Sequence, residues 1–314
     1  MFGLRSVFVA VVLSVLFAGS AQGDIKVVVS IKPIHALVAG VMTGAGAPSL
    51  IVDGAASPHT YSLKPSQAQA LQDADVVFWV GHELEGFLEK PLDTLGGGAK
   101  TVALMDLPDL SRLAFRENGP STSSDVAEKG HSHSHSHSHS HDHGEFDPHV
   151  WLDPENARVM VRSIASVLAG ADPENSDIYA ANATEISGRL DDLMSRMRAR
   201  LEPVQARPFV VFHDSYQYLE ARFGVSAVGS ITVVPDVMPG AERVAEIQHR
   251  VRDLKAVCVF SEPQFTPKLV QVVAEGGVVK TGTLDPIGAS LVAGPDLYFE
   301  LMDNLTRDIA DCLS

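Results

Sequence analysis

The chain has 314 residues, which is enough for two domains of ordinary size, each with its own hydrophobic core. Hydrophobic residues make up 45% of the sequence and charged residues 20%, a composition typical of a globular protein rather than a disordered one. The formal net charge of −15 disfavours binding to nucleic acid and to anionic lipid, whose phosphates repel an acidic surface.

The N-terminus has the pattern of a secretory signal peptide. Arg5 precedes an apolar run, Val7 to Phe17, that is too short to span a bilayer, and small residues follow before the polar Asp24. We expect residues 1–23 to be removed; the alternative is an uncleaved membrane anchor. No cysteine lies near the expected cleavage site, so we expect no lipid attachment there. These features predict a protein of the Gram-negative periplasm.

The mature chain is predicted to be an α/β protein with two lobes, at residues 24–172 and 204–314. In the first lobe, short β-branched runs alternate with helical patterns, and alternation of this kind predicts a parallel sheet covered on both faces. The predicted strands of this lobe are 25–31, 50–52, 76–80 and 101–104, with helices at 65–71 and 84–95. The second lobe repeats the pattern, with strands at 209–212, 227–231, 257–260 and 278–281 and helices at 240–253 and 267–275.

A long helix is predicted to join the two lobes. A first Asp-Pro-Glu sequence at Asp153 opens a helix, with proline at its first position. A second one at Asp172 opens another helix that can run to Leu201, interrupted only by Gly188. We assign residues 173–203 to this linking helix. At 1.5 Å per residue it would be about 40 Å long, enough to cross from one domain to the other. A cleft between two similar lobes is a usual place for a small ligand.

A histidine-rich loop at about residues 116–146 interrupts the first lobe. The segment is poor in large apolar residues, and its histidines alternate with serine and aspartate in a way that no globular core requires. Such tracts bind transition metals weakly, and imidazole suits copper and nickel as well as zinc. The alternative is a polar linker without a metal role. The alternating histidines are His131, His133, His135, His137, His139, His141 and His143.

Four isolated residues are candidate metal ligands because they follow predicted strands or lie in connecting loops. In doubly wound folds, ligands bind outside the carboxyl ends of the strands. Taken singly, a histidine after a strand is more often an ordinary loop residue than a ligand, Asp285 could be only part of a turn, and spacing alone does not bring the four together. The four candidates are His59, His149, His213 and Asp285. His82 also follows a strand and is not excluded, whereas His35 and His249 are expected to be ordinary helix residues.

The two cysteines, Cys258 and Cys312, suggest a disulfide in an oxidising compartment. The bond would close a loop of about 50 residues and contribute roughly 4 kcal/mol in the chain-entropy model. The alternative is one buried thiol and one thiol in a frayed tail.

Five segments resemble the zinc-uptake periplasmic binding proteins of the cluster A-I substrate-binding family, and the likeness extends over the mature chain. The segments are DGAASPHTYSLKPS at 53–66, HVWLDP at 149–154, FHDSY at 212–216, SEPQF at 261–265 and GTLDP at 282–286. The histidine-rich loop and the cysteine pair also lie where members of that family have them. The resemblance implies two lobes, each with a four-stranded parallel sheet flanked by helices, joined by a long rigid helix.

The resemblance also implies a ligand set and a function. It implies that His59, His149 and His213 bind zinc and that Asp285 or water completes the site. Manganese-binding relatives have glutamate at the position of His213, which favours zinc here. Some zinc-binding members have glutamate immediately before the first ligand histidine, where this chain has Pro58, so one candidate oxygen ligand is missing.

The function implied is that of a monomeric receptor, not an enzyme. It would deliver Zn²⁺ to the permease of an ATP-driven (ABC) importer, with local loop movements gating the site and other periplasmic zinc-binding proteins as further candidate partners. Three alternatives stay open. They are a catalytic zinc site, a receptor for manganese, nickel or copper, and a periplasmic zinc buffer without an importer.

Overall fold

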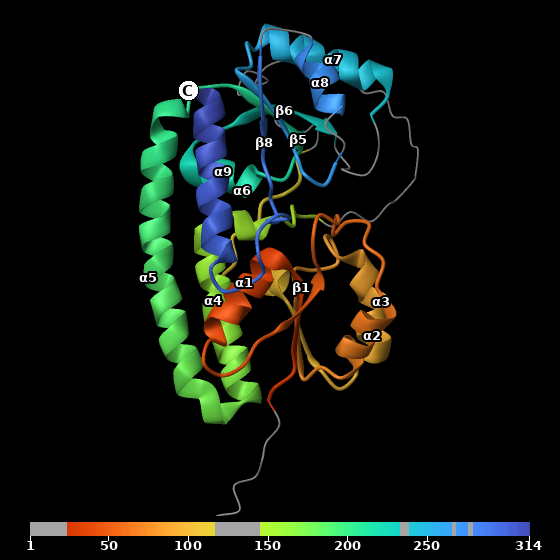
Figure 1. Ribbon diagram of the computed structural model, residues 1–314, viewed down its shortest axis with the longest axis vertical. Coiled ribbons are helices and arrows are strands. Elements are labelled where there is room, and N and C mark those ends of the chain that lie inside the picture. Colours follow the sequence, from red (N-terminus) through yellow and green to blue (C-terminus); the bar gives the residue numbers. More distant parts are fainter. Residues whose placement is uncertain (1–23, 117–144, 233–238, 266–267, 276–278) are drawn as a thin grey trace, which may run out of the picture.

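The computed structural model describes residues 24–116, 145–232, 239–265, 268–275 and 279–314 (Figure 1). The expected signal peptide and the histidine run from His131 to His143 lie outside these residues. Within the described part of the chain, no helix is long and apolar enough to cross a membrane.

The N-terminal lobe contains a four-stranded parallel sheet of order β2-β1-β3-β4. The central strand β1 consists almost entirely of β-branched residues and is buried along its whole length, as expected where helices cover both faces of a sheet. The strands are β1 Val27–Ile31, β2 Ser49–Val52, β3 Val76–Trp79 and β4 Lys100–Ala103. The helices between them are α1 Lys32–Val41, α2 Pro65–Gln72 and α3 Gly86–Leu95.

The C-terminal lobe repeats this topology with the order β6-β5-β7-β8, again all parallel. Alternate residues of the inner strand β5 point into two different cores, because side chains on a strand alternate between its faces. Phe209 and Val211 belong to the large core shared with the other lobe, whereas Val210 and Phe212 belong to a smaller core under α7 and α8. The strands are β5 Phe209–His213, β6 Ala227–Thr232, β7 Cys258–Ser261 and β8 Lys280–Thr283, and the helices are α6 Gln217–Phe223, α7 Ala241–Asp253 and α8 Lys268–Ala274.

The predicted fold class is confirmed, with small shifts in the ends of the elements. The joining helix α5, Ser176–Leu201, has 26 residues and runs beside both lobes (Figure 1). It begins later than the Asp-Pro-Glu pattern indicated, because a 3-10 turn at Pro173–Asn175 comes first. The carboxylate of Asp172 accepts hydrogen bonds from the side chains of Asn175 and Tyr179 and does not cap the helix. By contrast, Asp153 caps α4, Pro154–Ala171, as expected.

A second helix also joins the lobes. Helix α9, Leu297–Leu313, follows the second lobe in the sequence but packs along α5 and against α1 (Figure 1). Arg196 and Arg200 of α5 form ion pairs with Asp303 of α9, at 3.0 and 3.4 Å. One hydrophobic core therefore extends through both lobes, and the lobes are not two independent bodies on a hinge.

A buried lysine connects the lobes on the side of the cleft. Lys32 opens α1 and is only 5% exposed. Its Nζ donates hydrogen bonds to the carbonyl oxygens of Ala289 and Leu291, each at 3.0 Å, and forms an ion pair with Asp53 at 3.1 Å. A single cation thus holds the loop that follows β2 and the loop at residues 288–291 of the other lobe.

The disulfide between Cys258 and Cys312 is confirmed. It joins the first residue of β7 to α9, with 6.0 Å between the Cα atoms and a separation of 54 positions in the sequence. The C-terminal helix is therefore covalently attached to the sheet of the second lobe.

Replacing both cysteines with alanine should lower the free energy of unfolding by about 2–5 kcal/mol, because the unfolded chain then loses a long loop constraint. Urea unfolding of the variant and the wild type, without reductant, measures this difference. Wild-type protein unfolded in excess reductant is the control, and its free energy of unfolding should approach that of the variant. An equal midpoint for the oxidised wild type and the variant would contradict the prediction.

Candidate metal site between the lobes

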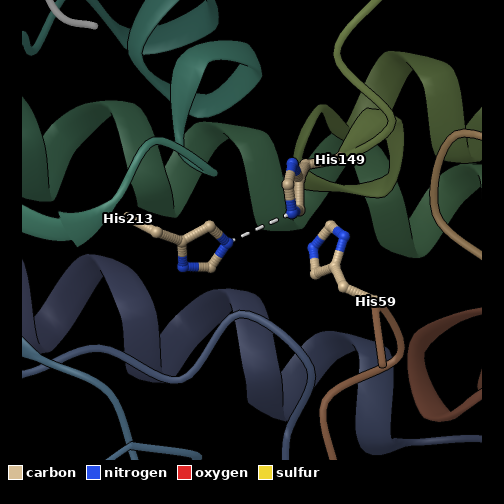
Figure 2. Close-up of side chains that lie close together, drawn as sticks. All are labelled: His59, His149 and His213. Carbon is tan, nitrogen blue, oxygen red and sulfur yellow. Dashed lines mark hydrogen bonds between the residues drawn. The ribbon is translucent and has the colours of Figure 1, made fainter. Parts of the chain in front are cut away.

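Three histidines from three separate segments meet in the cleft (Figure 2). His59 lies in the loop between β2 and α2, His149 immediately precedes a 3-10 turn at Val150–Leu152, and His213 is the last residue of β5. Each histidine offers one ring nitrogen, and these three nitrogens all lie within 4.8 Å of one another. Distances of this size allow three nitrogens to bind one ion at bond lengths of about 2 Å.

The pocket around these rings is small and largely shielded from solvent. His149 and His213 are each 5% exposed, and His59 is half-buried. The pocket has a volume of about 20 Å³, which suits one ion or one water molecule rather than an organic ligand. Its other walls come from both lobes and comprise Ser57, Pro58, Trp151, Glu262, Gln264, Phe265, Pro286 and Ile287.

A buried carboxylate orients His149. The Nδ1 atom of His149 lies 2.7 Å from Oδ1 of Asp147, which also accepts the backbone N–H of His149 at 3.0 Å. The Nδ1–H bond to the carboxylate directs the lone pair of Nε2 into the pocket. Burial, together with the nearby charge of His213, lowers the pKa of His149 well below its usual value. Burial also raises the pKa of Asp147, to about 7.

A second carboxylate orients His213 in the same way. Both oxygens of Glu262 lie 2.8 Å from Nδ1 of His213, and Tyr216 donates its hydroxyl to Glu262 at 3.3 Å. Burial lowers the pKa of His213, but the charge and hydrogen bond of Glu262 outweigh it, so the net pKa is raised. The Nε2 atoms of His213 and His149 face each other at 3.3 Å. Carboxylate–histidine pairs of this kind commonly support metal-binding histidines.

Trp151 fixes the turn that carries His149. The indole N–H of Trp151 donates to the carbonyl of Pro286 at 2.8 Å. The hydroxyl of Tyr298, on α9, donates to the backbone carbonyl of Trp151 at 2.8 Å. Because Trp151 is fully buried and bonded to both neighbours, the backbone next to His149 has little freedom to move.

The fourth predicted ligand, Asp285, is not part of the histidine cluster. Its Oδ1 atom accepts hydrogen bonds from Nε2 of Gln264 at 3.1 Å and from the backbone N–H of Ile287 at 3.3 Å. His82 is also outside the cluster; its ring is 57% exposed and lies 3.3 Å from Glu83.

The remaining two histidines lie on helices, as expected. His35 belongs to α1 and makes a 3.1 Å contact with the carbonyl of Pro48, and His249 lies on α7.

The sequence analysis missed the roles of Asp147 and Glu262. Glu262 directly follows β7, at the carboxyl edge where His213 also ends its strand. Asp147 stands two residues before His149, close enough to accept both its backbone and its ring N–H. An acidic residue two positions from a candidate ligand, or at a neighbouring strand end, is the signal that could have found them.

The chain is similar to proteins of known function. The family model described as "Zinc-uptake complex component A periplasmic" matches residues 27–312. The chain is 48% identical to the high-affinity zinc uptake system protein ZnuA of Brucella suis, with 99% of each chain covered. It is 37% identical to the protein of the same name from Yersinia pestis, with 91% of each covered.

The fold has counterparts among solved structures. The periplasmic zinc binding protein TroA from Treponema pallidum superposes with a TM-score of 0.78 at 22% identity, covering 93% of this chain and all of the other. The family match extends over nearly the whole described chain, and the two relatives cover 99% and 91% of it. The chain therefore belongs to the family of periplasmic zinc-uptake complex component A proteins.

Proposed function

We propose that this protein is a periplasmic zinc receptor that binds one Zn²⁺ ion as cargo between its lobes and delivers it to the permease of an ABC importer. The observation that carries the proposal is the cluster of His59, His149 and His213, whose ring nitrogens lie within 4.8 Å of one another. The family and the names of its zinc-uptake members support the same function.

The donor set favours zinc over manganese. Zn²⁺ accepts imidazole nitrogen readily and prefers four ligands, whereas manganese favours carboxylate and water oxygens. Both carboxylates next to the cluster, Asp147 and Glu262, are already bonded to the Nδ1 atoms of His149 and His213. These two carboxylates therefore orient nitrogen ligands and are not available as oxygen ligands for manganese. Copper and nickel also accept imidazole, so competition between metals is the relevant comparison for these two ions.

The size of the pocket favours a receptor over an enzyme. A catalytic zinc ion needs room beside it for a substrate. A pocket of about 20 Å³ suits an ion and a water molecule bound to it better than an ester or a peptide. The uptake function named for the family favours a partner importer over a buffer that acts alone.

We propose that water, rather than Asp285, takes the fourth position on the ion. Asp285 already accepts hydrogen bonds from Gln264 and from the backbone of Ile287. Both bonds hold Oδ1 outside the histidine cluster, so a shift of the carboxylate toward the ion would strain them, whereas a water molecule could reach the ion from the solvent.

The histidine run is proposed to collect zinc at low affinity. Fixing a chain segment around one ion costs about 1–2 kcal/mol per residue of backbone entropy, which disfavours a single tight site in a segment so poor in large apolar residues. Many interchangeable imidazoles instead favour several weak sites.

Alanine in place of His59, His149 or His213 should each weaken zinc binding by more than about 100-fold, because each variant loses a direct bond rather than a supporting one. Competition with a chromophoric chelator measures the affinity, in protein lacking residues 130–144 so that the run does not interfere. His82→Ala is the matched control, since His82 lies outside the cluster, and should bind as the parent does. A tight zinc site in the triple alanine variant would refute the assignment.

Asp285→Asn should change the zinc affinity less than about threefold, because the amide can still accept from Gln264 and the ion keeps its water. The same chelator competition applies, with Asp147→Asn as a comparison that disturbs an orienting carboxylate and should cost about 10–100-fold. A loss for Asp285→Asn comparable to that of a histidine variant would show that the carboxylate binds the ion directly.

Deleting residues 130–144 should lower the total number of zinc ions bound while leaving one tight site. Calorimetric titration of the full chain and the deletion variant, followed by thermal unfolding of both zinc-loaded proteins, makes the comparison. We expect nearly equal unfolding temperatures. If the tight site disappeared with the run, the division between a collecting loop and a carrying cleft would be wrong.

A further inference from the structure

We infer that α6 clamps the two chain segments on either side of residues 117–144 and thereby sets the position of His149 against His213, with Tyr218 as the central positioning residue. The clamp deepens the function proposed above and rests on it. Neither Tyr218 nor Arg116 touches the pocket, so both would act through other residues.

The two flanking segments pair with each other. Ala114 and Phe146 form an antiparallel bridge, and the backbone N–H of Asp147 donates to the carbonyl of Leu113 at 2.8 Å. Residues 113–116 and 146–147 therefore form a short stem, two residues before His149. The position of this stem sets where the segment that carries His149 begins.

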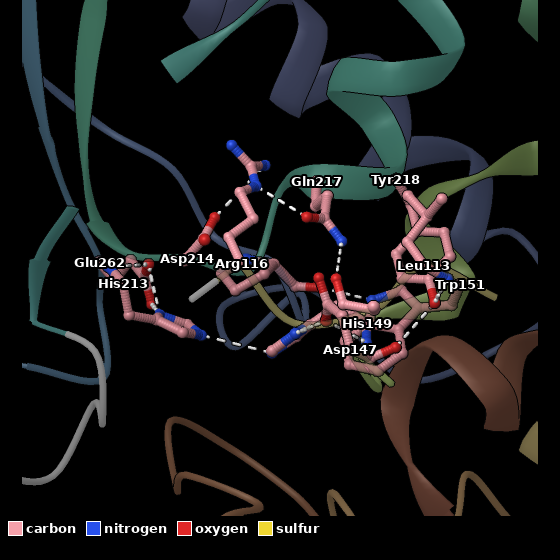
Figure 3. A network of polar contacts seen from close by, with 12 residues as sticks. Leu113, Arg116, Asp147, His149, Trp151, His213, Asp214, Gln217, Tyr218 and Glu262 are labelled. Atoms are coloured by element: carbon pink, nitrogen blue, oxygen red, sulfur yellow. Dashed lines mark hydrogen bonds and ion pairs between the residues drawn. The ribbon is translucent and has the colours of Figure 1, made fainter. Parts of the chain in front are cut away.

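Tyr218 holds both sides of the stem with one hydroxyl group. Its oxygen accepts the backbone N–H of Leu113 at 2.9 Å and donates to the carbonyl of Asp147 at 2.8 Å (Figure 3). Tyr218 is 2% exposed, so water does not readily replace these bonds. It belongs to α6, which begins four residues after His213, so the stem is fixed to the lobe that carries His213.

Gln217 and Arg116 extend the clamp. Gln217 donates its amide N–H to the carbonyl of Ala114 at 3.0 Å and accepts Nε–H of Arg116 at 2.7 Å. The guanidinium also forms ion pairs with Asp214 at 3.4 Å and Glu220 at 3.1 Å. Asp214 directly follows His213, and Figure 3 shows the network running from the stem to both histidines.

Asp147 connects the clamp to the metal site. Its carbonyl is held by Tyr218, while its carboxylate holds both the backbone and the ring of His149. Metal–ligand distances tolerate errors of only about 0.2 Å, so a small shift of Asp147 would disturb the ligand geometry. The clamp therefore affects binding through the placement of one ring.

Other contacts hold the lobes together without the clamp. Helices α5 and α9 span both lobes, Lys32 bridges the cleft, and Arg222 of α6 forms an ion pair with Asp153 at 2.7 Å. Loss of the Tyr218 hydroxyl should therefore leave the fold intact and act on the metal site. This separates a positioning role from a purely structural one.

The test compares Tyr218→Phe with Tyr179→Phe. Tyr179 is also buried, and its hydroxyl makes one hydrogen bond, to Asp172 at 2.6 Å, where that of Tyr218 makes two, but it lies on α5 away from the stem. Zinc affinity is measured by chelator competition, zinc release by stopped flow, and stability by thermal unfolding of the metal-free proteins. Arg116→Met is a second variant that leaves the Tyr218 bonds in place.

We expect Tyr218→Phe to raise the zinc dissociation constant about tenfold, chiefly through faster release, as for other residues that support metal ligands. Arg116→Met should shift it in the same direction by less. Tyr179→Phe should lower the unfolding temperature but keep wild-type affinity. Wild-type affinity in Tyr218→Phe would overturn the clamp alone. A wild-type protein without a tight zinc site would overturn the proposed function as well, so the two failures are distinguishable.

Discussion

The structure depends on holding three imidazole rings, from residues 59, 149 and 213, within reach of a single ion. The three rings contact one another with centroids 5.2 to 6.0 Å apart, and the Nε2 atoms of His149 and His213 lie 3.3 Å apart, but such contacts between polar rings are weak. The surrounding structure must therefore supply the order. Two sets of contacts do so. Helices that pack along both lobes hold the lobes in place, and buried carboxylates hold the rings of His149 and His213.

The two lobes are held together more rigidly than two domains joined by a hinge. Two long helices, α5 and α9, run along both lobes, and the disulfide attaches α9 to β7. The core continues from one lobe to the other through these helices. Large hinge closure would have to break this core, so movements that admit or release an ion are expected in the loops at the cleft.

The sequence predicted the fold well because its signals are local. Apolar runs such as Val27–Ile31 predict a strand, and helix openings such as Asp153-Pro154 predict a helix, without reference to the rest of the chain. It predicted the candidate ligands only in part, because the approach of His59, His149 and His213 is a property of the folded chain. The resemblance to a family supplied that grouping, but it did not show that Asp285 is bonded to Gln264. Nor could any local pattern reveal that Tyr218, the second residue of α6, would bond the carbonyl of Asp147.

The charges around the site match the demands of a carrier. A doubly charged ion in a buried pocket is costly unless opposite charge lies near it. Asp147 and Glu262 supply that charge through the rings they hold, without bonding to the ion themselves. In the proposed site the direct ligands are then neutral nitrogens and one water molecule. Water exchanges more easily than a carboxylate fixed by the fold, so an incoming ligand from a permease could begin the transfer at that position. In the proposed receptor, tight capture and release to a partner would then be compatible in one site.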